Sequence, residues 1–113
     1  MKRAIIYTRV STDDQAIHGY SLNNQKDVLE RYCRQNNFQI IKHYEEDYSA
    51  KDFERPEFKN LMEFCKKEHK SIDILLFTRW DRFSRNIGEC HAIFKQFGKL
   101  GIEINSIEQP TED

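Results

Sequence analysis

Apolar residues follow two different spacings along this chain, and the spacing changes at regular intervals. Residues 3–10 carry a short apolar run centred on Ala4–Tyr7, and similar runs occur at 38–44, 72–77 and 102–107. Short runs of this kind, rich in β-branched and aromatic residues, predict four strands. The run at 72–77 is nearly continuous, as in a strand of a parallel sheet that is buried on both faces.

Between these runs the apolar residues recur at the three- and four-residue spacing of helices. The spacing predicts one helix over 21–36, a second over 56–68 and a third that begins at Ile87 and is stopped by Gly98 to Gly101. Residues 45–55 are polar and acidic, which predicts a loop. Strands and helices alternate, so we predict an α/β fold of three layers: a mainly parallel central sheet with helices on both faces.

Length and charge narrow the class of protein. A chain of 113 residues is the size of one domain, so we expect residues 1–113 to form a single domain. Eighteen Lys and Arg against nineteen Asp and Glu give a formal charge of −1. That balance argues against binding nucleic acid by overall charge, and any basic site must be local.

The chain also lacks the marks of a membrane or secreted protein. Its apolar runs are far shorter than the ~20 residues that cross a bilayer, and its N-terminus does not resemble a signal peptide. Cys33, Cys65 and Cys90 are odd in number and widely spaced, which suits reduced thiols and not a zinc site. We therefore expect a cytoplasmic protein with no membrane partner and no structural zinc.

Polar residues cluster where the predicted strands end, which is where open α/β sheets bind ligands. Alternate residues of a strand share a face, so Tyr7, Arg9 and Ser11 are expected to point to one side, with a hydroxyl beside a guanidinium. Ser11 has two interpretations: it caps a turn, or it acts as a nucleophile. There is no G-x-S-x-G motif, and only His18 lies near Ser11 in the sequence, so a Ser-His-Asp hydrolase fits poorly.

A second polar cluster follows the third predicted strand. Residues 79–85 hold three arginines and one aspartate, and a helix that begins early places Arg85 about one turn from both Asp81 and Arg82. A solvated, salt-bridged turn would have the same composition. The position at a strand end favours a phosphate site instead, because the guanidinium fork matches phosphate oxygens. A site rich in Arg and poor in His points to stabilisation of a charged phosphoryl transition state.

Gln25 falls on the apolar stripe of the first predicted helix, where a buried amide needs hydrogen-bond partners. It either reaches solvent at the edge of the stripe or directs its amide toward the loop that contains Ser11.

Together these residues resemble the catalytic domain of the serine site-specific recombinases, the resolvase and invertase group. The resemblance rests on Tyr7-x-Arg9-Val10-Ser11-Thr12-x-x-Gln15 at the first strand and Asp81-Arg82-Phe83-Ser84-Arg85 after the third. Three further segments are similar to the large serine recombinases: Gly19-Tyr20-Ser21-Leu22-x-x-Gln25, Asp47-Tyr48-Ser49-Ala50-Lys51 and Arg55-Pro56-Glu57-Phe58.

This resemblance implies cleavage and rejoining of DNA by transesterification. Ser11 would attack the phosphodiester to give a 5′-phosphoserine intermediate and a free 3′-hydroxyl. Arg9, Arg82 and Arg85 would hold the phosphate, and Asp81 would orient the arginines. Supporting positions would be Tyr7, Gln15, Gln25, Asp47 and Arg55. No metal and no nucleotide cofactor is implied.

The resemblance also implies partners. These are a double-stranded DNA recombination site and further copies of the chain, as a dimer or tetramer of the full-length protein. A dimerisation helix and DNA-binding domains are expected beyond Asp113, so residues 1–113 alone are expected to be inactive.

Two alternatives stay open. Asp47 and Asp81 are carboxylates at predicted strand ends, so they could hold Mg²⁺ in a metal-dependent nuclease or phosphatase. The chain could also be a recombinase-like module that binds partners without catalysis.

Overall fold

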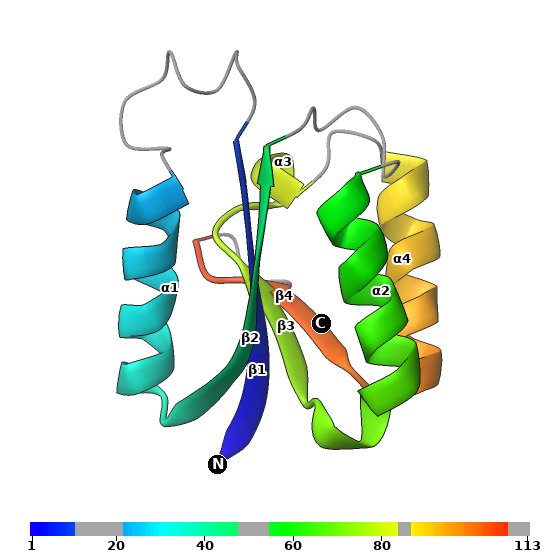
Figure 1. Ribbon diagram of the computed structural model, residues 1–113, viewed down its shortest axis with the longest axis horizontal. Helices are drawn as coiled ribbons and strands as arrows, with labels where there is room; N and C mark the ends of the chain where they lie inside the picture. The colour runs from blue at the N-terminus through cyan, green and yellow to red at the C-terminus, as the bar shows by residue number, and fades with distance from the viewer. Residues whose placement is uncertain (11–21, 48–54, 84–86, 109–113) are drawn as a thin grey trace.

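In the part of the chain that the structure describes, four parallel strands form a single sheet in the order β2-β1-β3-β4 (Figure 1). The computed structural model describes residues 1–10, 22–47, 55–83 and 87–108. The strands are β1 (Lys2–Val10), β2 (Phe38–Asp47), β3 (Ile74–Phe77) and β4 (Glu103–Ser106). Because β1 and β3 are central, their side chains from Ala4 to Val10 and from Ile74 to Phe77 are buried on both faces of the sheet.

Helices cover both faces of this sheet, as the sequence predicts. Helix α1 (Leu22–Gln35) lies on one face, and α2 (Pro56–Glu68) and α4 (Ile87–Leu100) lie on the other (Figure 1). Two shorter elements are η2 (His69–Ser71), a 3-10 turn before β3, and α3 (Trp80–Phe83), a single turn after it. The predicted three-layer α/β fold is therefore confirmed.

Alternation along β1 divides the core in two. Ala4 and Ile6 pack with Leu29 and Cys33 of α1, whereas Ile5 packs on the opposite face with α2 and α4. A strand that is apolar on both sides loses its hydrophobic contacts on both faces if it leaves the sheet. Its C-terminal end is consequently held in a fixed place.

The predicted end of the second strand was wrong. Strand β2 continues through Asp47, so Glu45, Glu46 and Asp47 belong to it and not to a loop. In the sheet these residues lie opposite Thr8, Arg9 and Val10. Their backbone groups gain ladder hydrogen bonds there, and this gain outweighs the low strand propensity of acidic residues.

The predicted third helix corresponds to α4, which begins at Ile87 and continues to Leu100. Of the two glycines at the predicted stop, Gly101 ends the helix, and its φ of 75° lies in the left-handed region. Gly101 N–H donates to the Gly98 carbonyl at 3.1 Å, and Ile102 N–H donates to the Phe97 carbonyl at 2.9 Å. This pair of bonds is a Schellman motif, which needs the freedom of glycine at position 101 and not at 98.

Strands β3 and β4 are shorter than predicted. Strand β3 begins at Ile74. The Ile72 N–H is not part of the strand pairing, because it donates to the His69 carbonyl in the 3-10 turn. Strand β4 spans Glu103–Ser106, one residue less at each end than the apolar pattern suggests.

The cysteines behave as apolar residues where they are buried. Burial raises the pKa of Cys33 to about 11 and that of Cys65 to about 12, so both stay as thiols at neutral pH. In the described part of the chain, no helix is long and apolar enough to cross a membrane.

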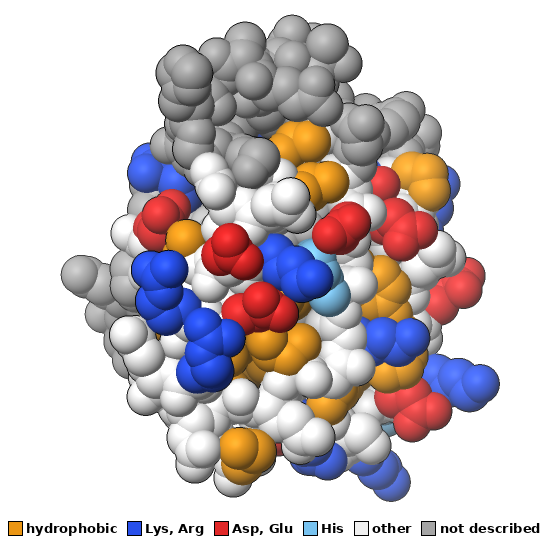
Figure 2. Space-filling model, turned by 60° about the vertical axis from the view of Figure 1, so that its left-hand side comes forward, with side chains coloured by type: hydrophobic (Ala, Val, Ile, Leu, Met, Phe, Trp, Pro, Cys, Tyr) orange, Lys and Arg blue, Asp and Glu red, His pale blue; other side chains and the backbone are white. Residues whose placement is uncertain are grey.

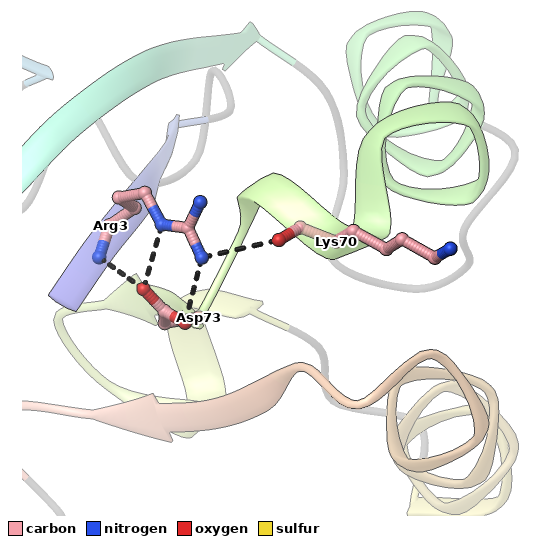
Figure 3. A network of polar contacts seen from close by, with 3 residues as sticks. All are labelled: Arg3, Lys70 and Asp73. Carbon is pink, nitrogen blue, oxygen red and sulfur yellow. Dashed lines mark hydrogen bonds and ion pairs between the residues drawn. The ribbon is translucent and has the colours of Figure 1, made fainter.

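An ion pair joins β1 to the turn before β3, at the end of the sheet opposite the carboxyl ends. Oδ2 of Asp73 accepts hydrogen bonds from the Arg3 backbone N–H at 2.7 Å and from Arg3 Nε at 3.1 Å (Figure 3). Arg3 Nη2 donates to Asp73 Oδ1 and to the Lys70 carbonyl. The hydrogen bonds from the Arg3 side chain and backbone lower the pKa of Asp73.

We predict that Asp73→Asn makes stability less sensitive to acid. A depressed carboxyl pKa in the folded state stabilises the protein above the ordinary Asp pKa of about 4, and this contribution disappears as the pH falls through the lowered value. The variant should be less stable than wild type at pH 7, by a small amount because the pair is partly exposed, and the difference should vanish in acid. Urea unfolding from pH 7 to 2 measures this, and an unchanged difference across that range would contradict it.

Candidate functional site

The carboxyl ends of the strands and the short helix α3 lie at one side of the molecule, together with the N-terminus of α2 (Figure 1). Three ionisable side chains there are almost completely buried: Arg9 at 1% exposure, Arg55 at 0% and Glu46 at 3%. Buried charges are costly unless they are paired and hydrogen-bonded. Their concentration at the carboxyl ends of the strands marks this region as the candidate site.

Arg9 is held in place through its main chain. Gln25 of α1 accepts a hydrogen bond from Arg9 N–H at 3.1 Å and donates to the Arg9 carbonyl at 2.9 Å. The Gln25 amide thus occupies both backbone polar groups of Arg9, much as a neighbouring strand would. Gln25 is 3% exposed, so the interpretation in which it reaches solvent is wrong.

Tyr7 connects the other two buried charges. Its hydroxyl donates to Glu46 Oε1 at 3.3 Å and accepts from Arg55 Nη1 at 3.2 Å. Burial is the main reason that the pKa of Tyr7 is raised above its ordinary value, with Glu46 adding to the effect and Arg55 opposing it. Tyr7 therefore stays protonated, and its hydroxyl donates a hydrogen bond to the Glu46 carboxylate.

Glu46 also caps the start of α2. Arg55 is the N-cap residue of this helix, with an extended backbone and no capping hydrogen bond from its own side chain, and Pro56 follows at the first helical position. The backbone N–H groups of Glu57 and Phe58 donate to Glu46 instead, at 3.3 and 2.9 Å. A carboxylate is favoured at this end of the helix dipole.

An aromatic cluster anchors α3 beneath the site. Phe83 is fully buried and stacks on Phe77 at 4.4 Å between ring centroids, with 11° between the ring planes. Phe83 also makes T-shaped contacts with Tyr7 and Phe58, with ring centroids 5.9 and 5.5 Å apart. The helix that carries Asp81 and Arg82 is thereby held against the end of β1.

The predicted site residues fall into two groups. The structure brings Tyr7, Arg9, Gln25 and Arg55 together at this edge. Asp47 lies at the end of β2 opposite Val10, and Asp81 and Arg82 lie in α3, but these three side chains are outside the described part of the chain. Ser11, Gln15 and Arg85 are outside the described residues altogether.

Glu46 is a site residue that the sequence reasoning missed. The alternation of β2 places Glu46 on the same face as Tyr44, which packs against the core that contains Tyr7. Extending the strand by two residues would have found it. The acidic run was assigned to a loop because its polarity hid the strand pattern.

A separate polar contact lies on the face of β1 that α1 covers. Thr8 Oγ1 is 2.9 Å from His43 Nε2, and burial lowers the pKa of His43. Thr8 is completely buried on the opposite face of β1 from Tyr7 and Arg9, so this contact lies outside the candidate site.

The surface over α1 carries charges of both signs. Figure 2 shows that positive and negative side chains are mixed there, and the described residues form no continuous basic face in this view.

Metal binding finds no support in the described part of the chain, where no group of three or more His, Cys, Asp or Glu residues is placed to hold an ion. The proposed Asp47 and Asp81 pair depends on side chains outside that part, so this alternative is untested by the structure.

Solved structures similar to this one include a catalytic domain of an integrase and a resolvase family recombinase. The N-terminal catalytic domain of TP901-1 integrase superimposes with a TM-score of 0.83 at 30% identity, over 94% of this chain and 77% of that chain. A resolvase family site-specific recombinase from Streptococcus pneumoniae has a TM-score of 0.82 at 26% identity, over 98% and 75% of the two chains.

Sequence comparison gives the family directly. An uncharacterized immunity region protein 3 of Bacillus phage phi105 is 46% identical over 56 residues, which is 49% of this chain and 68% of that protein. The family model for the resolvase N-terminal domain matches residues 4–113, nearly the whole chain. The chain therefore belongs to the resolvase N-terminal domain family.

Proposed function

We propose that this domain catalyses site-specific recombination of double-stranded DNA through a 5′-phosphoserine intermediate on Ser11. The observation that carries the proposal is the burial of two guanidinium groups, Arg9 and Arg55, at the end of the strand that leads to Ser11. Membership of the resolvase family and the similarity to recombinase catalytic domains support it.

The proposed reaction exchanges one phosphodiester for another. The Ser11 oxygen attacks phosphorus and forms a bond to the 5′-phosphate, while the bond from phosphorus to the 3′-oxygen breaks. The proton lost by the serine hydroxyl is balanced by the proton gained by the leaving 3′-oxygen. Rejoining reverses these steps with the 3′-hydroxyl of a recombining strand. The number of phosphate ester bonds is unchanged, so the reaction needs no nucleotide cofactor.

The buried arginines would stabilise the charge that develops on the phosphate. A guanidinium in a water-excluded site interacts with an anion more strongly than it does in bulk water, and it is already oriented before the reaction begins. We propose that Arg82 and Arg85 add two further donors from α3 and the segment after it, with Asp81 orienting them. Supporting roles are proposed for Tyr7, Gln15, Gln25, Asp47 and Arg55.

DNA affinity would come largely from outside this domain, because its formal charge is only −1. We propose that a dimerisation helix and DNA-binding domains beyond residue 113 supply it, that the full-length protein acts as a dimer or tetramer in the cytoplasm, and that residues 1–113 alone are inactive.

The proposed nucleophile can be tested with the full-length protein on its own recombination site. Wild type should form a covalent DNA adduct whose mass maps to Ser11, and Ser11→Ala should form none. EDTA should leave cleavage unchanged, because no step uses a metal. Ser71→Ala, an exposed serine at the opposite end of the sheet, is the matched control and should form the adduct like wild type.

Other outcomes identify the alternatives. Cleavage that stops in EDTA and survives Ser11→Ala would indicate a metal-dependent nuclease using Asp47 and Asp81. If no adduct forms on a genuine recombination site, the chain is a non-catalytic module and the proposal is wrong.

The role of Gln25 gives a second prediction. Gln25→Leu keeps the apolar packing of α1 but leaves the Arg9 N–H and carbonyl without the amide, so it should cost about 1–3 kcal/mol of unfolding free energy. It should also slow adduct formation, because Arg9 lies two residues before Ser11. Asn23→Ala, an exposed change in the same helix, is the control. Denaturant unfolding and adduct assays measure both effects, and a Gln25→Leu protein as stable and active as the control would refute the role.

A further inference from the structure

We infer that Glu46 is a positioning residue of this reaction, which acts by holding the Tyr7 hydroxyl and the start of α2 so that Arg55 is placed for the phosphate. The inference rests on the proposed function. It concerns a residue outside both motifs that identify the site, and it follows from three features of the buried contacts.

The first feature is the capping of α2 by a residue from another element. An N-cap side chain normally accepts hydrogen bonds from the second and third helical N–H groups, but an arginine has only donors. Glu46 accepts these bonds from Glu57 and Phe58 across the gap between β2 and α2. Arg55 therefore has no capping role to perform, and its side chain can turn inward to Tyr7.

The second feature is the direction of the hydrogen bonds. An ionised carboxylate only accepts and a guanidinium only donates, so the Tyr7 proton must point to Glu46 and the Tyr7 oxygen must accept from Arg55. Each group in the series Arg55, Tyr7, Glu46 consequently has one possible orientation. Without the carboxylate, the Tyr7 hydroxyl could rotate, and Arg55 would no longer face an oxygen with a fixed orientation.

The third feature is burial. All three side chains are 3% exposed or less, so solvent cannot replace a lost partner. A buried carboxylate carries a desolvation penalty that a neutral cap would avoid. A purely structural cap could be neutral, whereas a carboxylate also orients the tyrosine and balances positive charge beside the arginines. Glu46 is also the register partner of Arg9 in the pairing of β1 with β2.

The test is a double-mutant cycle in the full-length protein, with single-turnover cleavage of saturating DNA as the readout. Glu46→Gln should slow adduct formation about tenfold, the size expected when one charge-assisted hydrogen bond that positions the site is weakened, and should leave the Kd for DNA unchanged. In a Tyr7→Phe background the same change should have a much smaller effect, because Glu46 acts through the missing hydroxyl. A residue that merely supports the fold would show no such coupling.

Two further variants keep the test decisive. Glu45→Gln is the matched control: Glu45 is the neighbouring residue of β2, its side chain is 49% exposed, and cleavage should stay at the wild-type rate. Glu46→Asp keeps the charge and is expected to cleave at a rate between those of wild type and Glu46→Gln. Thermal unfolding confirms that each variant is folded at the assay temperature, and Glu46→Asp replaces Glu46→Gln in the cycle if the latter is not.

The inference is overturned if Glu46→Gln cleaves at the wild-type rate, or if its effect is equally large in wild type and in Tyr7→Phe. Either result would leave the proposed function intact, since wild type would still form the Ser11 adduct. Absence of that adduct in wild type is the separate result that would refute the proposed function.

Discussion

Burial of two guanidinium groups at one edge of the sheet is the constraint on which the rest of this structure depends. Arg9 and Arg55 are at most 1% exposed, and an arginine does not lose its charge to escape the cost of burial. The surrounding elements must therefore supply hydrogen-bond acceptors and negative charge in fixed places. The Tyr7 hydroxyl meets part of that requirement by accepting a hydrogen bond from Arg55 Nη1, and Glu46 brings a buried carboxylate to the same region.

The polar contacts around the two arginines come from different elements, which ties the site to the fold. Tyr7 comes from β1, Glu46 from β2 and Gln25 from α1, and each of their hydrogen bonds joins two elements. The aromatic cluster around Phe83 excludes water on one side and keeps α3 close to β1. Preorganised donors of this kind suit a reaction in which negative charge grows on a phosphate, since they need little reorganisation when it does.

Much of the fold could be predicted from the sequence, because the layers follow from apolar spacing alone. The errors occur where polar residues take part in regular structure. Strand β2 was ended too early because Glu45, Glu46 and Asp47 lack apolar alternation, although pairing with β1 continues through them. The sequence places the end of the third helix between Gly98 and Gly101 without choosing between the two glycines. Glycine ends a helix where the backbone must turn left-handed, and that position is Gly101.

Prediction of the candidate site from the sequence is limited in the same way. Tyr7, Arg9 and Arg55 could be found because their motifs resemble those of a known family, and Gln25 because a polar residue on an apolar stripe needs an explanation. Glu46 belongs to no family motif and does not interrupt an apolar stripe, so neither signal could identify it. Its role depends on the register between β1 and β2 and on the approach of α2. Such contacts are set by tertiary packing and leave little trace in local sequence.

The position of the scissile phosphate tests the central claim most directly. A structure of the full-length protein trapped on its recombination site should show that phosphate within hydrogen-bonding distance of the Arg9 and Arg55 guanidinium groups, with the contact between Tyr7 and Glu46 intact. A scissile phosphate that contacts neither arginine, or that binds on the face of the sheet covered by α1, would contradict the account.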